Sequence, residues 1–156
     1  MIEKVRKYFK NFGIEDKIIE FDVSSATVEL AAKALNTEGG RIAKSMSFDV
    51  GGEYVVIVMT GDVKVDNSKY KQTFKTKAKM LPYDMVGDII GHSAGGVCPF
   101  ALNDGVKVYL DESLKKYPTV FPACGSSNSA CEMTYLELEK YADNFSGWVD
   151  VTKVIE

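Results

Sequence analysis

The sequence predicts an α+β fold: a single domain over residues 1–156, with a mixed β-sheet and surrounding helices. Its 156 residues suit one domain and leave little room for a second. Strand-like and helix-like segments are mixed along the chain, but they do not alternate regularly enough for a doubly wound parallel sheet. No repeat, low-complexity stretch or linker rich in proline and glycine divides the chain.

The N-terminal part of the chain predicts a helix, a short strand and a second helix. The first helix ends near Gly13, which can adopt the left-handed conformation common at helix ends. Its apolar face comprises Ile2, Val5, Phe9 and Phe12. Residues 18–22 are typical of a short strand, and residues 27–35 of a helix that Ser24 or Ser25 can cap.

A β-hairpin is the clearest element of the sequence. Residues 47–60 contain two β-rich runs that flank Gly51-Gly52, a pair typical of a tight hairpin turn. The second run is nearly all apolar, as expected of a central strand that is covered on both faces.

The remaining elements follow in order toward the C-terminus. Thr134 and Glu137 have the spacing of a capping box, which predicts the start of the last helix. We expect helices over 67–74, 82–90 and 134–143, a loop over 91–100, strands within 106–114 and 119–124, and one final strand over 148–154.

Composition and motif spacing exclude several classes of protein. The content of 46% hydrophobic and 26% charged residues is typical of a soluble globular protein, and no apolar run approaches the ~20 residues of a membrane span. The N-terminal residues do not resemble a signal peptide, so we expect a cytoplasmic protein with reduced cysteines. The single histidine, the scattered cysteines and the glycine spacings match no zinc site or nucleotide-binding loop, so no metal or cofactor is predicted.

A lysine-rich segment stands out in a chain whose net charge is −3. From Lys64 to Lys79 the chain has six lysines and one acidic residue. Such a run is either a solvated helix face or a local basic patch that neutralises the phosphates of an RNA end. In the second case, Lys69, Lys71 and Lys75 are the candidate RNA contacts.

The segment GHSAGGVCPF, residues 91–100, holds three glycines, the only histidine, a cysteine and a proline. Glycine permits positive φ and the close approach of a ligand to the backbone. The consecutive N–H groups of Gly95, Gly96 and Val97 could therefore bind an oxyanion or a carbonyl oxygen. Pro99 stiffens the exit from the loop. The alternative is a tight structural turn.

Two reactive side chains lie in the same segment. His92 is either a general base or a packed or capping group. Cys98 has no second histidine to activate it and lies on an apolar exit, so we expect it to be a packing residue.

Two other segments carry polar groups. Lys44 lies in RIAKSMSF at the entrance of an apolar strand, where a lysine that points inward needs a partner or an anionic ligand and one that points outward does not. Gly125, Ser126 and Asn128 lie in CGSSNSACEMT, a polar turn that is either a hairpin loop or a site for a ribose or an amino group.

Taken together, the three segments resemble the family of YbaK and prolyl-tRNA-synthetase-associated domains, which are freestanding or inserted aminoacyl-tRNA editing domains. RIAKSMSF is similar to the family's lysine-bearing strand entrance, and GHSAGGVCPF to its GxxxGGxxPxG loop. CGSSNSACEMTYLEL is similar to its glycine/serine turn and the helix start that follows. The resemblance covers nearly the whole chain in the family's order.

The resemblance implies a trans-editing hydrolase that deacylates mischarged aminoacyl-tRNA, such as tRNA-Pro or a related tRNA that carries a small wrong amino acid. Positioned water and stabilisation of the developing oxyanion could suffice for an ester that is already activated. The implied catalytic residues are Lys44, Gly95 and Gly96; the implied substrate-binding residues are Ser45, His92, Val97, Pro99, Gly125, Ser126 and Asn128; and Lys69, Lys71 and Lys75 would contact tRNA. The implied partners are the acceptor end of the aminoacyl-tRNA and a prolyl-tRNA synthetase.

Two positions depart from the family's pattern. Ala101 stands where glycine is usual, and Tyr135 where proline is usual at the first helical position. Neither change removes a chemical group from the implied site. The alternative function is a non-catalytic module that binds a tRNA acceptor end or a small ligand, and release of amino acid from charged tRNA separates the two.

Overall fold

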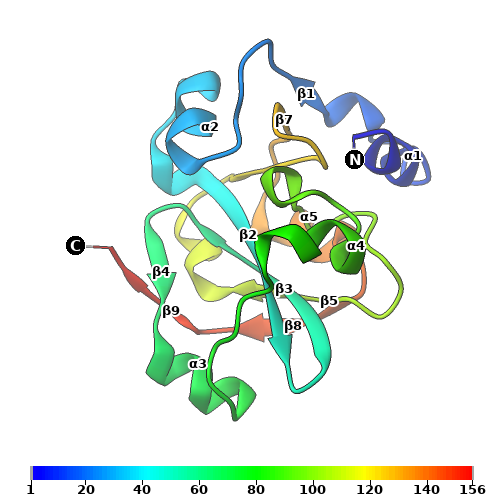
Figure 1. The fold of residues 1–156 in the computed structure, drawn as a ribbon. Helices are drawn as coiled ribbons and strands as arrows, with labels where there is room; N and C mark the ends of the chain where they lie inside the picture. Colours follow the sequence, from blue (N-terminus) through cyan, green and yellow to red (C-terminus); the bar gives the residue numbers. More distant parts are fainter. Residues whose placement is uncertain (1, 156) are drawn as a thin grey trace.

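A five-stranded mixed sheet forms the centre of the computed structural model, which describes residues 2–155 (Figure 1). The strand order is β6-β2-β3-β5-β8, in which β2 and β3 are antiparallel and the other neighbours are parallel. The strands are β2 (Ile42–Val50), β3 (Glu53–Thr60), β5 (Lys107–Asp111), β6 (Phe121–Pro122) and β8 (Phe145–Val149). Two small sheets pair β1 (Ile19–Glu20) with β7 (Ser129–Ala130), and β4 (Val63–Val65) with β9 (Thr152–Val154). The predicted α+β fold with a mixed sheet is confirmed.

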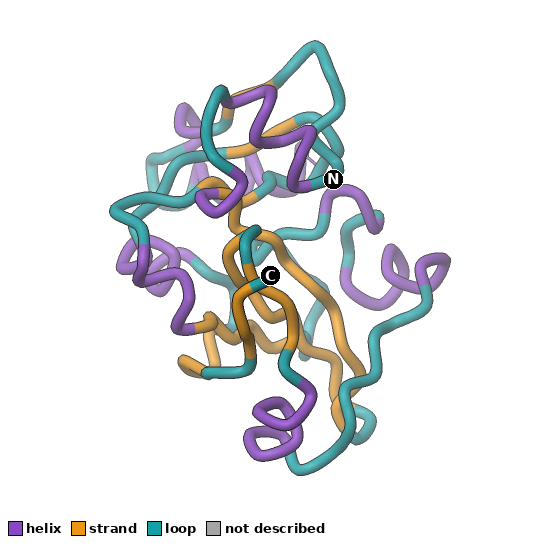
Figure 2. The backbone as a smooth tube through the Cα atoms, turned by 90° about the vertical axis from the view of Figure 1, so that its left-hand side faces the viewer, coloured by secondary structure: helices purple, strands orange, loops and turns teal. Residues whose placement is uncertain are grey.

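Helices surround this sheet, as the tube view shows with strands in the middle and helices at the periphery (Figure 2). The α-helices are α1 (Ile2–Lys10), α2 (Val28–Leu35), α3 (Asn67–Phe74), α4 (Val86–Ile90) and α5 (Tyr135–Tyr141). Short 3-10 turns occupy Glu15–Lys17, Gly39–Arg41, Tyr83–Met85, Ala94–Gly96 and Glu112–Lys116.

The central strand β3 divides the core into two parts. Val56 and Val58 lie in the cluster that α1, α4 and α5 cover, whereas Val55 and Ile57 lie in the cluster that contains Tyr70 of α3. These side chains point alternately to opposite faces because successive strand residues do so. The prediction of an apolar strand covered on both faces is therefore confirmed.

Local sequence signals fix the hairpin and the last helix. Gly51 and Gly52 have φ angles of +60° and +92°, the left-handed values that a tight hairpin turn requires. At α5, Thr134 Oγ1 accepts from the N–H of Glu137 at 3.1 Å, and Glu137 Oε1 accepts from the N–H of Thr134 at 3.0 Å. The predicted hairpin turn and the predicted capping box are both present.

The start of α2 differs from the prediction. Thr27 caps this helix, and its Oγ1 accepts from the N–H of Leu30 at 3.1 Å. The hydroxyls of Ser24 and Ser25 instead donate to the carbonyl of Ser127, at 3.5 and 3.3 Å. The prediction of a serine cap was wrong because the hydroxyls of both serines form hydrogen bonds with a distant turn.

Helix α1 is shorter than its apolar pattern predicts. The helix ends at Lys10, and Gly13 adopts the expected left-handed conformation, with φ of +71°. Val5 and Phe9 are fully buried, but Phe12 is 45% exposed because it lies in the turn beyond the helix.

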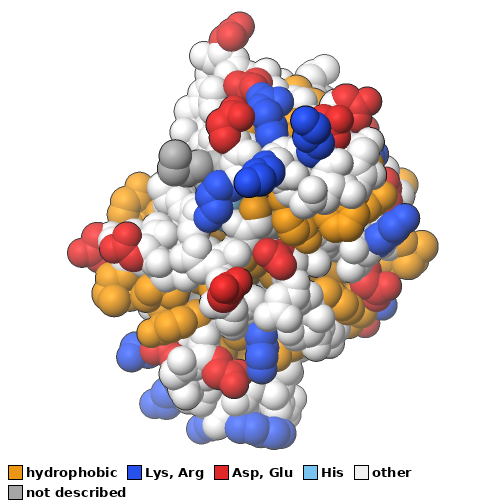
Figure 3. Space-filling model, turned by 90° about the vertical axis from the view of Figure 1, so that its right-hand side faces the viewer, with side chains coloured by type: hydrophobic (Ala, Val, Ile, Leu, Met, Phe, Trp, Pro, Cys, Tyr) orange, Lys and Arg blue, Asp and Glu red, His pale blue; other side chains and the backbone are white. Residues whose placement is uncertain are grey.

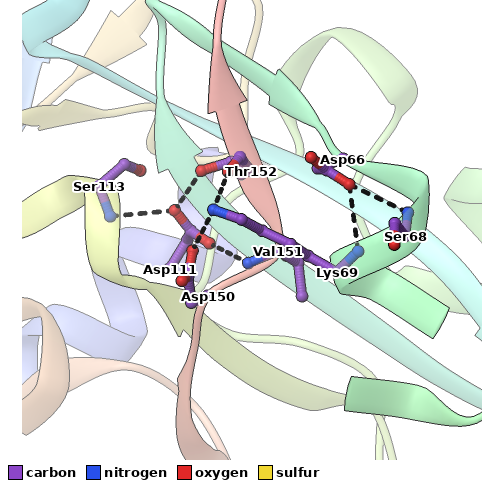
Figure 4. A network of polar contacts seen from close by, with 8 residues as sticks. All are labelled: Asp66, Ser68, Lys69, Asp111, Ser113, Asp150, Val151 and Thr152. Atoms are coloured by element: carbon purple, nitrogen blue, oxygen red, sulfur yellow. Dashed lines mark hydrogen bonds and ion pairs between the residues drawn. The ribbon is translucent and has the colours of Figure 1, made fainter. Parts of the chain in front are cut away.

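The final predicted strand is in fact two strands, β8 and β9, which belong to different sheets. Figure 4 shows the cause, a buried carboxylate at the end of β5. Asp111 accepts hydrogen bonds from the N–H of Val151 at 2.9 Å, the hydroxyl of Thr152 at 2.8 Å and the N–H of Ser113 at 3.0 Å. These bonds hold the chain between β8 and β9 against Asp111, so one continuous strand does not form.

Candidate active site

A pocket of about 90 Å³ lies between α2, the first residues of β2 and the turn at Ala94–Gly96. Of the predicted site residues, Lys44, Ser45, Gly95 and Val97 line it. The rest of the wall is mostly small or apolar and includes Ala31, Ile42, Ala43 and Phe121. The fold thus brings the lysine-bearing strand and the glycine loop to one cavity.

Lys44 is the charged side chain of this pocket. It is half-buried, and its Nζ donates to the carbonyl of Val63. Burial lowers the pKa of Lys44 below its usual value of 10.5, and the carboxylates of Asp62 and Glu29 oppose this change. The ammonium is therefore only partly compensated by the protein, as expected of a group that has room for an anionic ligand.

Asp62 holds the turn that supports Lys44. Its carboxylate accepts from the hydroxyls of Thr60 and Tyr117, both at 2.6 Å, and from Lys116 Nζ at 3.0 Å. Burial raises the pKa of Asp62, but these hydrogen bonds outweigh it and lower the pKa to about 2. The turn before Val63 therefore stays anionic and anchored at neutral pH.

The glycine loop is built differently from its predicted form. Neither Gly95 nor Gly96 has positive φ. A Cβ added to Gly96 would lie 2.7 Å from the backbone nitrogen of Ser126, so this glycine is needed for close packing of the loop against the polar turn. A Cβ on Gly95 would have ordinary contacts, at 3.5 Å from Ser127 Cβ and 3.6 Å from Ala26 Cβ.

The predicted row of three N–H donors is reduced to two. The N–H of Gly96 donates to the carbonyl of Ser93 at 2.8 Å, within the 3-10 turn. Within residues 2–155, the N–H groups of Gly95 and Val97 have no hydrogen-bond acceptor. These two groups are the remaining candidates for contact with a ligand oxygen.

The polar turn packs against the glycine loop. Its predicted site residues, Gly125, Ser126 and Asn128, do not line the pocket. Ser126 Oγ donates to Asn128 Oδ1 at 3.0 Å and shares a hydrogen bond with Ser129 Oγ at 2.6 Å. Asn128 Nδ2 donates to the carbonyl of Phe21 at 3.0 Å, and Gly125 is buried with φ of +89°. Ser129, a residue of the same turn that was not among the predicted site residues, does line the pocket.

His92 and Pro99 lie in the core behind the loop. His92 is 1% exposed, and its Nε2 is 2.6 Å from the carbonyl oxygen of Phe100. Burial lowers the pKa of His92 to about 4, against the effect of this hydrogen bond. Pro99 is buried, and its carbonyl accepts from the N–H of Asp143 at 2.8 Å. Neither residue lines the pocket.

Cys98 lies next to His92, a proximity that the sequence did not indicate. The Sγ atom is 3.5 Å from His92 Nε2, but the thiol is fully buried and burial raises its pKa to about 12. A thiolate–imidazolium pair is disfavoured when the pKa of the thiol is raised and that of the imidazole is lowered. The geometry agrees with the predicted packing role of Cys98.

The predicted tRNA contacts Lys69, Lys71 and Lys75, on and just after α3, lie apart from the pocket. Tyr70 of α3 packs on Phe48, which is four residues beyond Lys44 on β2, roughly 13 Å along the strand. Lys69 forms an ion pair with Asp150 at 3.0 Å (Figure 4). Lys71 and Lys75 are exposed, and Figure 3 shows Lys and Arg side chains gathered at the lower end of the molecule, where α3 lies in Figure 1.

Residues 2–155 contain neither a membrane-spanning helix nor a metal-binding cluster. No helix in this range is long and apolar enough to cross a membrane. No group of three or more histidine, cysteine, aspartate or glutamate side chains in the same range is placed to hold a metal ion.

Comparison with known proteins identifies the family. Residues 23–141 match the family described as the aminoacyl-tRNA editing domain. The chain is 49% identical over 154 residues to the uncharacterized protein YwhH of Bacillus subtilis, with 97% of each chain covered. It is 29% identical over 90 residues to a proline–tRNA ligase of Lysinibacillus sphaericus, a match that covers 57% of this chain and 16% of the ligase.

A solved structure shares the whole fold. It is described as a candidate trans-editing enzyme for prolyl tRNA synthetase, with a TM-score of 0.86, 25% identity, and coverage of 97% of this chain and 96% of that one. The family match spans the three segments that form and support the pocket. The chain is a member of the aminoacyl-tRNA editing domain family.

Proposed function

We propose that this protein hydrolyses the ester bond of a mischarged aminoacyl-tRNA in trans, with the reaction centred on Lys44 and the Gly95–Val97 turn. The observation that carries the proposal is the partly compensated ammonium of Lys44 in a small pocket that the glycine loop also lines. Membership of the editing-domain family supports the substrate class.

The chemistry needs no covalent nucleophile from the protein. A water molecule attacks the ester carbonyl carbon, the bond from this carbon to the ribose oxygen breaks, and the ribose oxygen takes a proton. The amino acid leaves as a carboxylate, and one proton is released to solvent. The N–H groups of Gly95 and Val97 stabilise the developing oxyanion, and Lys44 provides a point charge for the same oxygen or a nearby phosphate.

The size of the pocket favours a small amino acid. Its volume is about 90 Å³, and Ala31, Ala43 and Phe121 form part of its wall. Ser45 lines the same wall, and in this proposal its hydroxyl binds a ribose hydroxyl or the amino group. In this proposal Gly96, Gly125, Ser126 and Asn128 hold the loop in shape, and His92 and Pro99 support it from the core.

The tRNA body lies outside the pocket. Lys71 and Lys75, which are exposed on and after α3, are proposed to contact its phosphates, whereas the ion pair with Asp150 already occupies Lys69. The likeness to part of a proline–tRNA ligase supports tRNA-Pro as the first substrate to test and a prolyl-tRNA synthetase as a partner in the cytoplasm.

Single-turnover deacylation over a panel of charged tRNAs tests the proposal. We expect Lys44→Ala to lower the rate on the best substrate by about 10²-fold or more, the scale of losing one well-placed electrostatic contact. Lys64→Ala, which removes an exposed lysine from the adjacent β4, is the matched control and should keep the parental rate. Parental turnover by folded Lys44→Ala would refute the role of Lys44. Binding of the acceptor end without release of amino acid would instead favour a non-catalytic module.

A further inference from the structure

A second cleft adjoins the proposed catalytic pocket and has no role in the mechanism above. Its volume is about 260 Å³, and Met80, Tyr83 and Val86 form part of its lining. Ser45 and Val97 line both cavities. The cleft therefore lies directly beside the pocket that contains Lys44.

The lining of this cleft suits a flat, uncharged group. No charged side chain is among its lining residues in the described part of the chain. Tyr83 is 82% exposed and Met80 is 53% exposed, so a large ring and a thioether face solvent at the rim. Aromatic side chains stack on nucleobases through their π-faces, so a nucleobase is a ligand that suits this rim.

Ser45 has an unmet hydrogen-bonding capacity at the wall between the two cavities. Its Oγ is buried, and within residues 2–155 it has no hydrogen-bond partner. Buried hydroxyls are normally satisfied, and a hydroxyl can both donate and accept. A ribose hydroxyl is the group that lies between the ester and the base in an aminoacyl nucleotide, so it would reach this position.

A basic stretch of chain leads to the cleft. The N–H of Asp49 donates to the carbonyl of Lys79 at 2.9 Å, and the N–H of Leu81 donates to the carbonyl of Ser47 at 3.2 Å. The chain from α3 to α4 thus runs beside the end of β2, as Figure 1 shows. Lys77 and Lys79 are exposed on this stretch, directly before the residues that line the cleft, and Lys79 Nζ lies 3.8 Å from Asp49 Oδ2.

We propose that the cleft rimmed by Met80 and Tyr83 binds the terminal adenine of the tRNA acceptor end, with Ser45 on the ribose and the preceding phosphates near Lys77 and Lys79. This inference rests on the proposed function for its substrate. Its own support is the order of the features: a basic stretch, an apolar cleft with an exposed ring, an unsatisfied hydroxyl and then the pocket that contains Lys44.

Two esters test the assignment. Both contain the amino acid that is released fastest in the panel of charged tRNAs. One is the 3′-ester of adenosine and the other is the ethyl ester, which has no base. We expect Tyr83→Ala to raise KM for the adenosine ester about tenfold or more with little change in kcat, because stacking is lost. The same variant should hydrolyse the ethyl ester at the parental rate. Tyr83→Phe, which keeps the ring, should resemble the parent, and so should Leu136→Ala, a control that is 61% exposed on α5.

A binding measurement separates this inference from the proposed function. Adenosine 5′-monophosphate should shift the methyl resonance of Met80 in the parent, and Tyr83→Ala should weaken this binding. If the parent deacylates tRNA but Tyr83→Ala has parental KM values and parental nucleotide binding, the base subsite is refuted and the function stands. If Tyr83→Ala changes the preference among amino-acid ethyl esters, the cleft holds the amino-acid side chain and the inference is wrong. Nucleotide binding that depends on Tyr83, without deacylation by the parent, would support the subsite and remove the hydrolase proposal.

Discussion

Alanine at Gly96 should lower stability and alanine at Gly95 should lower activity, although the two glycines are adjacent. A Cβ on Gly96 would lie 2.7 Å from the nitrogen of Ser126 and 2.8 Å from both the carbonyl carbon of Gly125 and the Cα of Ser126. These are backbone atoms and cannot rotate away. A Cβ on Gly95 would lie 3.5 Å or more from its neighbours, and one of these, Ala26, lines the pocket as Gly95 itself does.

The distances set the expected magnitudes. Gly96→Ala forces the loop and the polar turn apart, and overpacking of this kind costs about 1–3 kcal/mol of unfolding free energy. Gly95→Ala should leave the unfolding free energy within about 0.5 kcal/mol of the parent. Its methyl group narrows a pocket of about 90 Å³, so kcat/KM should fall, and a single methylene changes such discrimination by roughly 10–200-fold.

Urea unfolding and single-turnover deacylation measure the two effects separately. Gly87→Ala is the control, because a Cβ there would meet nothing within 4 Å. The reasoning is refuted for Gly96 if its alanine variant unfolds at the parental urea midpoint. It is refuted for Gly95 if the alanine variant keeps the parental kcat/KM on the best substrate, since the residue then does not face the ester.

Four further predictions address charge and backbone strain. Because burial lowers the pKa of Lys44, the deacylation rate, corrected for uncatalysed hydrolysis, should fall as pH rises through a value below 10.5; Lys44→Arg should be slower than the parent but show no such fall, and an alkaline limb in this variant would contradict the assignment. The single His92 ring resonance should not titrate between pH 5 and 8, and an NMR titration midpoint near 6.5 would show an accessible ring. Because the pKa of His92 is about 4 in the folded state and about 6.5 in the unfolded state, its protonation should remove up to about 3 kcal/mol of unfolding free energy as the pH falls from about 6.5 to about 4. Ala101 has φ of +53°, so Ala101→Gly should raise the unfolding free energy by about 1 kcal/mol, and a loss in urea unfolding would show that the methyl group is needed for packing. Replacing Lys71 and Lys75 by Gln should flatten the salt dependence of tRNA binding, whereas an unchanged slope would mean that they form only a solvated face.

The sequence alone determined the elements whose cause is local. The Gly51-Gly52 turn, the Thr134–Glu137 capping box and the apolar run of β3 each depend on residues a few positions apart, so a short window is enough to read them. The three segments that carry the family resemblance were likewise readable, and the fold brings Lys44 and Gly95 to one pocket.

Long-range contacts decided the rest. Asp111 divides the final strand by binding residues 40 and 41 positions away, and Ser127 takes up the serines that would have capped α2. Gly96 is glycine because a turn 30 residues further along the chain packs against it, which no local pattern records.

The same holds for the roles of individual side chains. His92 lies in the core and not in the pocket, and the hydrogen bond between its Nε2 and the carbonyl of Phe100 fixes its position there. The second cleft exists because the stretch around Lys79 pairs with the end of β2 and brings Met80 and Tyr83 beside Ser45. The sequence names residue types that are capable of chemistry, but burial, donor use and neighbours depend on contacts between distant segments, and these exist only once the chain has folded.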